Sequence, residues 1–191
     1  MENVSRPGWI EIICGPMFAG KSEELIRRIK RLEYAKKKTL VFKPSIDVRY
    51  SANEVVSHSN LKAKSIAIKE SKEILDYVDS STFAIAVDEV QFLDKDIIYL
   101  AQKLALKGIR VILGGLDTDF RGEPFPITAS LMTIAEDVLK LTAICVVCGA
   151  PATKTQRIIN GKPAHYADPI IKVGASEAYE PRCRHCHQVV K

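Results

Sequence analysis

The sequence predicts an α/β fold in which a doubly wound, mostly parallel sheet is followed by a small C-terminal zinc-binding domain. Short apolar runs of strand length alternate with segments whose apolar residues recur at helical spacing. A glycine-rich loop separates the first such strand from the first helix, and two pairs of cysteines lie near the C-terminus. We expect the boundary near residue 144, with one domain over residues 1–144 and the other over residues 145–191.

Length, composition and charge limit the class of protein. The 191 residues contain no apolar run of membrane-spanning length, and the first eight lack the apolar stretch of a signal peptide. We therefore expect a cytoplasmic protein without a membrane partner. Residues 145–191 hold seven Lys/Arg and three Asp/Glu, so they supply +4 of the net charge of +5. Nucleic-acid binders usually carry a denser basic stripe, so we expect a small phosphorylated ligand and no nucleic acid.

The first strand, loop and helix form a phosphate-binding motif. Residues 9–14 are an apolar run, and residues 22–36 have helical spacing. The loop between them reads G-x-x-x-x-G-K-S and consists of Gly15, Pro16, Met17, Phe18, Ala19, Gly20, Lys21 and Ser22. Its backbone amides would bind phosphate oxygens, Lys21 would reach the β- and γ-phosphates, and Ser22 would hold Mg²⁺. The alternative is a chance match in an ordinary loop, against which the flanking strand and helix argue.

The next segments continue the alternation. Residues 38–43 are predicted as a strand that Pro44 ends, and residues 65–68 as a short strand. Between them, residues 45–64 are polar and form a loop whose length suggests a functional role. Residues 71–78 have helical spacing.

The apolar run over residues 83–89 ends in two acids, Asp88 and Glu89. Acids at the C-terminal end of a buried parallel strand lie where ligands bind in open α/β sheets. We predict that Asp88 holds Mg²⁺ together with Ser22. Glu89 is placed to act on the attacking nucleophile, either by orienting a water molecule or by taking the proton of a substrate hydroxyl.

The remaining core segments complete the α/β pattern. In chain order they are a helix over 95–107, a strand over 109–113 that Gly114-Gly115 ends, a loop over 116–125, a helix over 130–136 and a strand over 138–147. The loop contains Phe120 and Phe125. These two rings either form a lid or pocket wall, or pack beneath the loop as part of the core. Their spacing in the sequence is compatible with both.

Two C-x-x-C pairs, separated by 34 residues, predict a structural zinc site. The ligands would be Cys145, Cys148, Cys183 and Cys186. The alternatives are a redox pair or cysteines that only fill the core. His185 and His187 could replace a ligand, but we expect both at the surface, and Cys14 reads as a small core residue.

The motifs taken alone leave three functional classes open. A kinase would pass the phosphoryl group to a substrate hydroxyl. A P-loop ATPase with a nucleic-acid-binding zinc ribbon would pass it to water. A zinc-stapled nucleotide-binding regulator would not catalyse at all. The small size and single core favour a small-molecule kinase.

Several segments together resemble the cytosolic, zinc-containing thymidine kinases. They are, in order, Gly15–Ser22, Phe42-Lys43-Pro44 with Asp47-Val48-Arg49-Tyr50, Asp88-Glu89-Val90-Gln91-Phe92, Gly115-Leu116-Asp117 with Phe120, the two cysteine pairs, and Val173-Gly174 followed by Tyr179. The resemblance spans about Trp9 to Cys186. It implies ATP-dependent phosphorylation of the 5′-hydroxyl of thymidine or deoxyuridine.

The same resemblance implies roles for individual residues. Glu89 is implied as the general base, and Lys21, Ser22, Asp88, Asp47, Arg49 and Gln91 as residues that serve the phosphates and Mg²⁺. The nucleoside pocket is implied to consist of Met17, Phe92, Leu116, Phe120, Phe125, Thr155, Tyr179 and a zinc-tethered lasso loop with Ile170, Ile171, Lys172, Val173 and Gly174. A homotetramer and inhibition by thymidine triphosphate are also implied.

Overall fold

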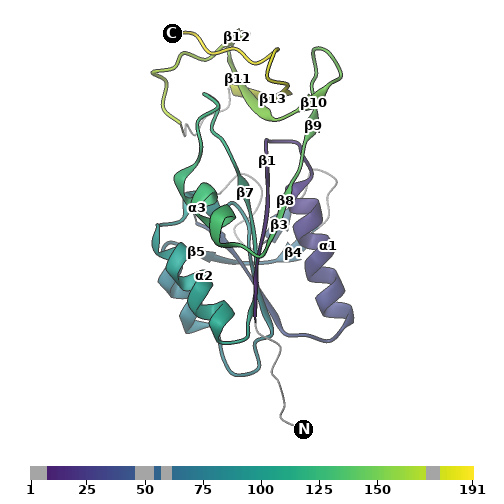
Figure 1. Ribbon diagram of the computed structural model, residues 1–191, viewed down its shortest axis with the longest axis vertical. Helices are drawn as coiled ribbons and strands as arrows, with labels where there is room; N and C mark the ends of the chain where they lie inside the picture. The colour runs from purple at the N-terminus through teal and green to yellow at the C-terminus, as the bar shows by residue number, and fades with distance from the viewer. Residues whose placement is uncertain (1–7, 46–53, 57–61, 171–176) are drawn as a thin grey trace.

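A computed structural model describes residues 8–45, 54–56, 62–170 and 177–191. Its centre is a six-stranded sheet in the order β5-β2-β6-β7-β1-β8, in which every neighbouring pair is parallel (Figure 1). The strands are β1 (Ile10–Gly15), β2 (Thr39–Pro44), β5 (Ile66–Ile68), β6 (Ala84–Val87), β7 (Arg110–Leu116) and β8 (Asp137–Lys140). The predicted α/β fold with a mostly parallel sheet is confirmed.

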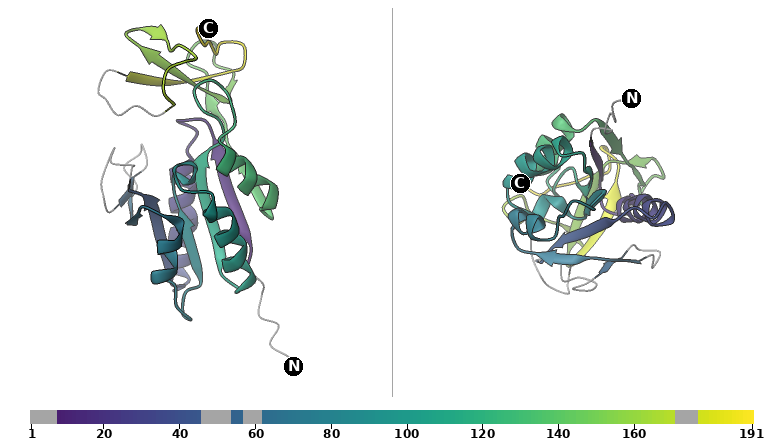
Figure 2. Two further views of the ribbon diagram at one scale, coloured as in Figure 1. Left: turned by 90° about the vertical axis from the view of Figure 1, so that its left-hand side faces the viewer. Right: turned by 90° about the horizontal axis from the view of Figure 1, so that it is seen from below.

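Helices cover both faces of this sheet, so the doubly wound arrangement is also confirmed (Figure 2). On one face α1 (Lys21–Tyr34) packs Leu25, Ile26 and Ile29 against Ile13 and Ile112 of the sheet. The other face carries α2 (Asp96–Leu106), α3 (Pro126–Ile134) and the short 3-10 helices η1 (Ser71–Asp76) and η2 (Val90–Phe92). Strands buried on both faces explain why the sequence shows continuous apolar runs rather than alternation.

The strand predicted over residues 109–113 is longer than expected, because β7 continues through Gly114 and Gly115 to Leu116. A Cβ at Gly115 would lie 2.7 Å from Gln91 Oε1 and 2.9 Å from Val90 Cγ1. These glycines therefore do not end the strand. Gly115 lets η2 pack closely against the strand, which brings residues 90 and 91 next to the end of β7, and Gly114 lies against Asp88.

Other boundaries also differ from the sequence prediction. The segment predicted as a helix over 71–78 forms the 3-10 helix η1, and the strand predicted over 138–147 is divided into β8 and β9 (Ala143–Ile144). The helix predicted over 130–136 begins at Pro126, where a proline suits the first helical position, rather than at residue 130. The expected loop over 45–64 contains the antiparallel strands β3 (Glu54–Val56) and β4 (Lys62–Lys64).

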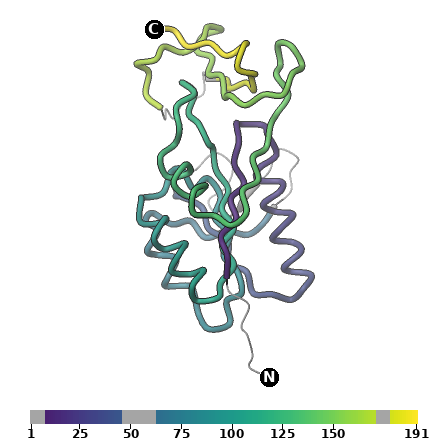
Figure 3. The backbone as a smooth tube through the Cα atoms, viewed as in Figure 1, coloured from purple at the N-terminus to yellow at the C-terminus, as the bar shows by residue number. Residues whose placement is uncertain are grey.

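The C-terminal part lies beyond the C-terminal ends of the parallel strands (Figure 3). It consists of β9 paired with β10 (Pro151–Ala152), and of β12 (Lys162–Pro163), β11 (Lys154–Ile159) and β13 (Glu177–Arg182) in a second small sheet. Ala143, Cys145, Ala152 and Cys183 form its own apolar cluster. The division into domains 1–144 and 145–191 stays a prediction.

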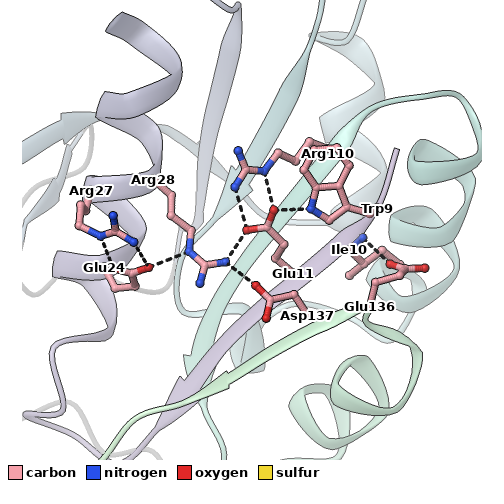
Figure 4. Close-up of polar contacts among 9 residues, drawn as sticks. All are labelled: Trp9, Ile10, Glu11, Glu24, Arg27, Arg28, Arg110, Glu136 and Asp137. Carbon is pink, nitrogen blue, oxygen red and sulfur yellow. Dashed lines mark hydrogen bonds and ion pairs between the residues drawn. The ribbon is translucent and has the colours of Figure 1, made fainter. Parts of the chain in front are cut away.

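A network of ion pairs ties α1 to the opposite, N-terminal end of the sheet (Figure 4). Glu11 of β1 is 2% exposed and accepts hydrogen bonds from Arg28, Arg110 and the Trp9 indole. Burial raises the pKa of the Glu11 carboxyl, but the bonds and charge of Arg110 and the bond of Arg28 hold it below its usual value.

None of the helices within the described residues combines the length and the apolarity that crossing a membrane requires.

Candidate functional site

The loop between β1 and α1 curls around the start of the helix. Gly15 has a φ of 143°, and a Cβ there would lie 2.4 Å from the Leu141 carbonyl oxygen, so only glycine fits. Gly20 has a φ of 82° and is the N-cap residue of α1. The Lys21 ammonium donates to the Pro16 carbonyl at 2.8 Å, which places its charge inside the curl of the loop. Helix terminus and lysine together form the geometry of an anion site.

Asp88 directly follows β6 and faces the start of α1. Ser22 Oγ donates to Asp88 Oδ2 at 3.0 Å, and the Glu89 amide donates to Asp88 Oδ1 at 3.0 Å. Burial, with the neighbouring Glu89 charge, raises the pKa of the Asp88 carboxyl to about 7. A hydroxyl and a carboxylate in contact at the end of a phosphate-binding loop form a donor set that Mg²⁺ prefers.

Glu89 lies in the left-handed region with a φ of 51°. Such a backbone conformation is costly for a residue with a side chain, and it is kept where the surrounding structure requires it. Gln91 donates to the Glu89 carboxylate through its amide nitrogen, while its amide oxygen accepts from the Leu116 amide at 3.0 Å. Gln91 therefore links Glu89 to the end of β7, and its assignment to the phosphates or Mg²⁺ stays a prediction.

The charges around Lys21 include a carboxylate to which sequence analysis gave no role. Burial lowers the pKa of the Lys21 ammonium, and the charges of Glu89, Asp88 and Asp117 act in the opposite direction. Asp117 follows β7, is 5% exposed and pairs with Lys140 Nζ at 2.9 Å. Asp117 belongs to the Gly115-Leu116-Asp117 segment on which the family resemblance partly rests. The local sequence pattern does not indicate that β8 brings Lys140 beside it.

The residues predicted for the nucleoside pocket come from both parts of the molecule. Phe92 and Phe125 meet edge to face with ring centroids 6.3 Å apart. Phe120 is buried at 3% exposure, so this ring packs beneath the loop rather than forming an open lid. Thr155 of β11 is buried and accepts a hydrogen bond from the Met17 amide at 3.0 Å.

For the other predicted pocket residues, the structure gives a position in the fold or lacks a description. Leu116 ends β7 and is partly buried, Tyr179 lies on β13 in register with Arg157, and Ile170 is exposed. Asp47, Arg49, Ile171, Lys172, Val173 and Gly174 lie outside the described residues.

The four predicted zinc ligands meet at one point. The sulfur atoms of Cys145, Cys148, Cys183 and Cys186 all lie within 4.8 Å of one another. Four thiols converging from two knuckles fit a tetrahedral zinc ion and leave no position for a substrate. The expectation of a surface position is wrong for His187, which is partly buried and contacts the Phe120 carbonyl at 2.8 Å through Nε2. His185 is exposed, as expected.

Comparison with known proteins adds a family match and two distant structural likenesses. A family model described as thymidine kinase matches residues 8–187. Domain III of the replication initiation protein DnaA of Thermotoga maritima is 16% identical with a TM-score of 0.41, and the match covers 73% of this chain and 56% of that one. The Pif1 helicase of Candida albicans is 13% identical with a TM-score of 0.41, covering 70% and 36% respectively. The chain thus spans little more than half of the first structure and about a third of the second.

Proposed function

The chain belongs to the thymidine kinase family, and we propose that it transfers the γ-phosphoryl group of ATP to the 5′-hydroxyl of thymidine, and also of deoxyuridine. The observation that carries this proposal is the group of Lys21, Ser22, Asp88 and Glu89 at the C-terminal ends of β1 and β6. It brings together a lysine within the glycine loop, a hydroxyl in contact with a carboxylate, and a second carboxylate, which supports binding of phosphate and a divalent cation beside a proton acceptor.

Each residue of this group has a distinct part in the proposed reaction. The loop amides and Lys21 bind the β- and γ-phosphates. Ser22 and Asp88 would hold Mg²⁺, which neutralises charge on the transferring phosphoryl group when it is bound. Glu89 takes the proton of the 5′-hydroxyl as the hydroxyl oxygen forms a bond to the γ-phosphorus. The bond between the γ-phosphorus and the β–γ bridging oxygen breaks, and ADP leaves. Gln91 holds the Glu89 carboxylate in place for this step.

The contact between Thr155 and the Met17 amide supports a nucleoside pocket between the two parts of the chain. This bond joins the second small sheet directly to the phosphate loop, and the paired Phe92 and Phe125 rings supply apolar surface from the parallel-sheet part. A planar base fits between apolar side chains of this kind, with a few polar groups reading its edge. We propose Met17, Leu116, Phe120 and Tyr179 as further members of this pocket.

The direct test is chromatography of purified protein incubated with Mg-ATP and either thymidine or deoxyuridine. The expected result is conversion of each nucleoside to its 5′-monophosphate with equal release of ADP. Release of ADP without a nucleoside monophosphate would contradict the proposal and favour the ATPase alternative. If single-stranded nucleic acid then stimulated the release of ADP, the C-terminal part would be identified as a nucleic-acid-binding zinc ribbon.

Further properties are proposed from family membership together with the chemistry of the sites. The four cysteines hold structural zinc, so a metal-to-protein ratio of one is expected from atomic emission. The implied homotetramer, cytoplasmic location and inhibition by thymidine triphosphate belong to the same proposal. Light scattering tests the homotetramer, and turnover measured at increasing thymidine triphosphate concentration tests the inhibition.

A further inference from the structure

Two arginines from different segments lie over two aromatic rings. The Arg157 guanidinium lies 5.2 Å from the Phe120 ring centroid, and the Arg121 guanidinium lies 5.4 Å from the same ring. Arg121 also lies 4.8 Å from the Tyr166 ring centroid. Planar guanidinium groups stack on aromatic faces in a way that the ammonium of lysine does not reproduce. These contacts join Arg157, Phe120, Arg121 and Tyr166 into one cluster.

Both arginines also donate hydrogen bonds to consecutive backbone carbonyls. Arg157 donates through Nη1 to the Pro169 carbonyl oxygen, and Arg121 donates through Nη2 to the Asp168 carbonyl oxygen at 2.8 Å. These carbonyls directly precede Ile170, the first residue predicted to contact the base. The two side chains thus hold the chain at the point where it enters the predicted lasso loop.

Arg157 is 0% exposed. A buried charge is costly unless it is well bonded, so the position of a fully buried guanidinium indicates where the fold needs strong donors. Its neighbour on the same face of β11 is Thr155, which accepts from the Met17 amide of the phosphate loop. One strand therefore contacts both the phosphate loop and the segment that leads to the base.

The zinc cluster holds a different end of the same segment. Cys183 follows β13 directly, so the metal restrains the chain after residue 182, whereas the arginines restrain it before residue 170. The Tyr166 amide also holds this part of the chain by donating to the Val190 carbonyl oxygen at 2.7 Å, but the arginines bond directly to residues 168 and 169. Sequence reasoning assigned the restraint of this loop to zinc only, because the arginine contacts join residues far apart in the chain.

We propose that Arg157 and Arg121 are positioning residues that hold Asp168 and Pro169, and with them Ile170, against the nucleoside pocket. This inference rests on the proposed function and adds two specificity-determining residues to it. The hydrogen bonds of the arginines described above are made to the chain that is proposed to bind the base. Their replacement therefore weakens nucleoside binding selectively, while ATP binding and zinc content stay as in the unchanged protein.

The test uses the full-length zinc-loaded protein with Arg157→Lys and Arg121→Lys, each of which keeps the positive charge. We expect the KM for thymidine to rise by roughly tenfold for Arg157→Lys, the scale of one charged hydrogen bond, and by less for the partly buried Arg121. The KM for ATP should stay within about twofold, because the hydrogen bonds of both arginines described above are made to residues 168 and 169 and not to the phosphate loop. Arg182→Lys is the matched control, since Arg182 lies on the adjacent β13 and bonds only Glu180 among the described contacts.

Hydrogen exchange supplies a readout that does not need turnover. The peptide over residues 165–170 should exchange faster in Arg157→Lys and Arg121→Lys than in the unchanged protein and in Arg182→Lys. Unchanged exchange and an unchanged KM for thymidine in both variants would overturn the inference, as would equal increases of both KM values. If Arg157→Lys does not fold, Arg121→Lys decides alone. If the unchanged protein makes no thymidine monophosphate, the proposed function fails, while the exchange measurement still supports or overturns the arginine anchor.

Discussion

Two buried carboxylates at opposite ends of the same sheet have opposite electrostatic environments. Glu11, near the N-terminal end of β1, is surrounded by Arg28 and Arg110, and its pKa is lowered. Asp88, beyond the C-terminal end of β6, is buried beside a second carboxylate, and its pKa is raised to about 7. The first arrangement favours the charged form and stabilises the fold. The second makes the charged form of Asp88 costly in the absence of a cation, which is the property expected of a binding site.

The largest effect on stability is expected from Glu11→Gln. Glu11 has a side chain 3% exposed, and its loss as an anion leaves Arg28 and Arg110 without their shared partner. Breaking a buried ion pair from one side typically costs about 3–5 kcal/mol. Urea unfolding should show a decrease of this size in the free energy of unfolding. A decrease no larger than that of a surface substitution would mean that the Glu11 network does not anchor α1.

The pH dependence of stability sharpens the comparison, since the two carboxylates contribute with opposite signs. Between the ordinary value of 3.8 and about 7, the folded protein keeps a proton on Asp88 that the unfolded chain has released. Its contribution therefore favours folding at low pH and is lost as the pH rises through 7. Glu11, with a lowered pKa, contributes stability above its ordinary value of 4.5 that is lost as the pH falls through its lower folded value.

The measurement is urea unfolding of the protein and of Asp88→Asn without added magnesium, from about pH 5 to about pH 7.5. One proton accounts for a slope of at most about 1.4 kcal/mol per pH unit. Asp88→Asn should remove a downward slope of up to this size. Identical slopes in both proteins would show that Asp88 does not take up a proton on folding.

The smallest effect is expected from Arg27→Ala, which lies close to the Glu11 network but outside its core. Arg27 bonds only Glu24 among the described contacts, and its side chain is 57% exposed. Exposed ion pairs contribute little because water and salt screen them. The urea midpoint should match that of the unchanged protein. A clear decrease would extend the stabilising network beyond Glu11, Arg28 and Arg110.

The two ends of the sheet also differed in how well the sequence predicted them. The phosphate loop with Ser22, and the acids Asp88 and Glu89, were predicted because each is a local motif at the end of an apolar strand. Glu11 lay unnoticed within such a strand, since its partners stand 17 and 99 residues away. For the same reason the contacts of Lys140 with Asp117 and of Arg157 with Pro169 were not foreseen.

The predicted end of the strand over residues 109–113 is wrong for a related reason. Gly114 and Gly115 read as the end of a strand, because a Gly-Gly pair usually marks a turn or loop. In the structure Gly115 instead provides room for Val90 and Gln91, and Gly114 lies against Asp88, so the packing of other segments requires these glycines. The four cysteines were predicted in full because their spacing is a local signal, although the pairs come together from distant parts of the chain.

The most direct test of the functional site is the turnover of Glu89→Gln with Mg-ATP and thymidine, measured beside ATP affinity and the urea midpoint. The central claim is that the acids at the C-terminal end of β6 perform chemistry while the network at the other end maintains the fold. We expect a fall in turnover of about 10²-fold or more, the scale of a general base, with ATP affinity and the urea midpoint near their original values. Near-normal turnover, or an equal loss of stability and activity, would contradict the claim.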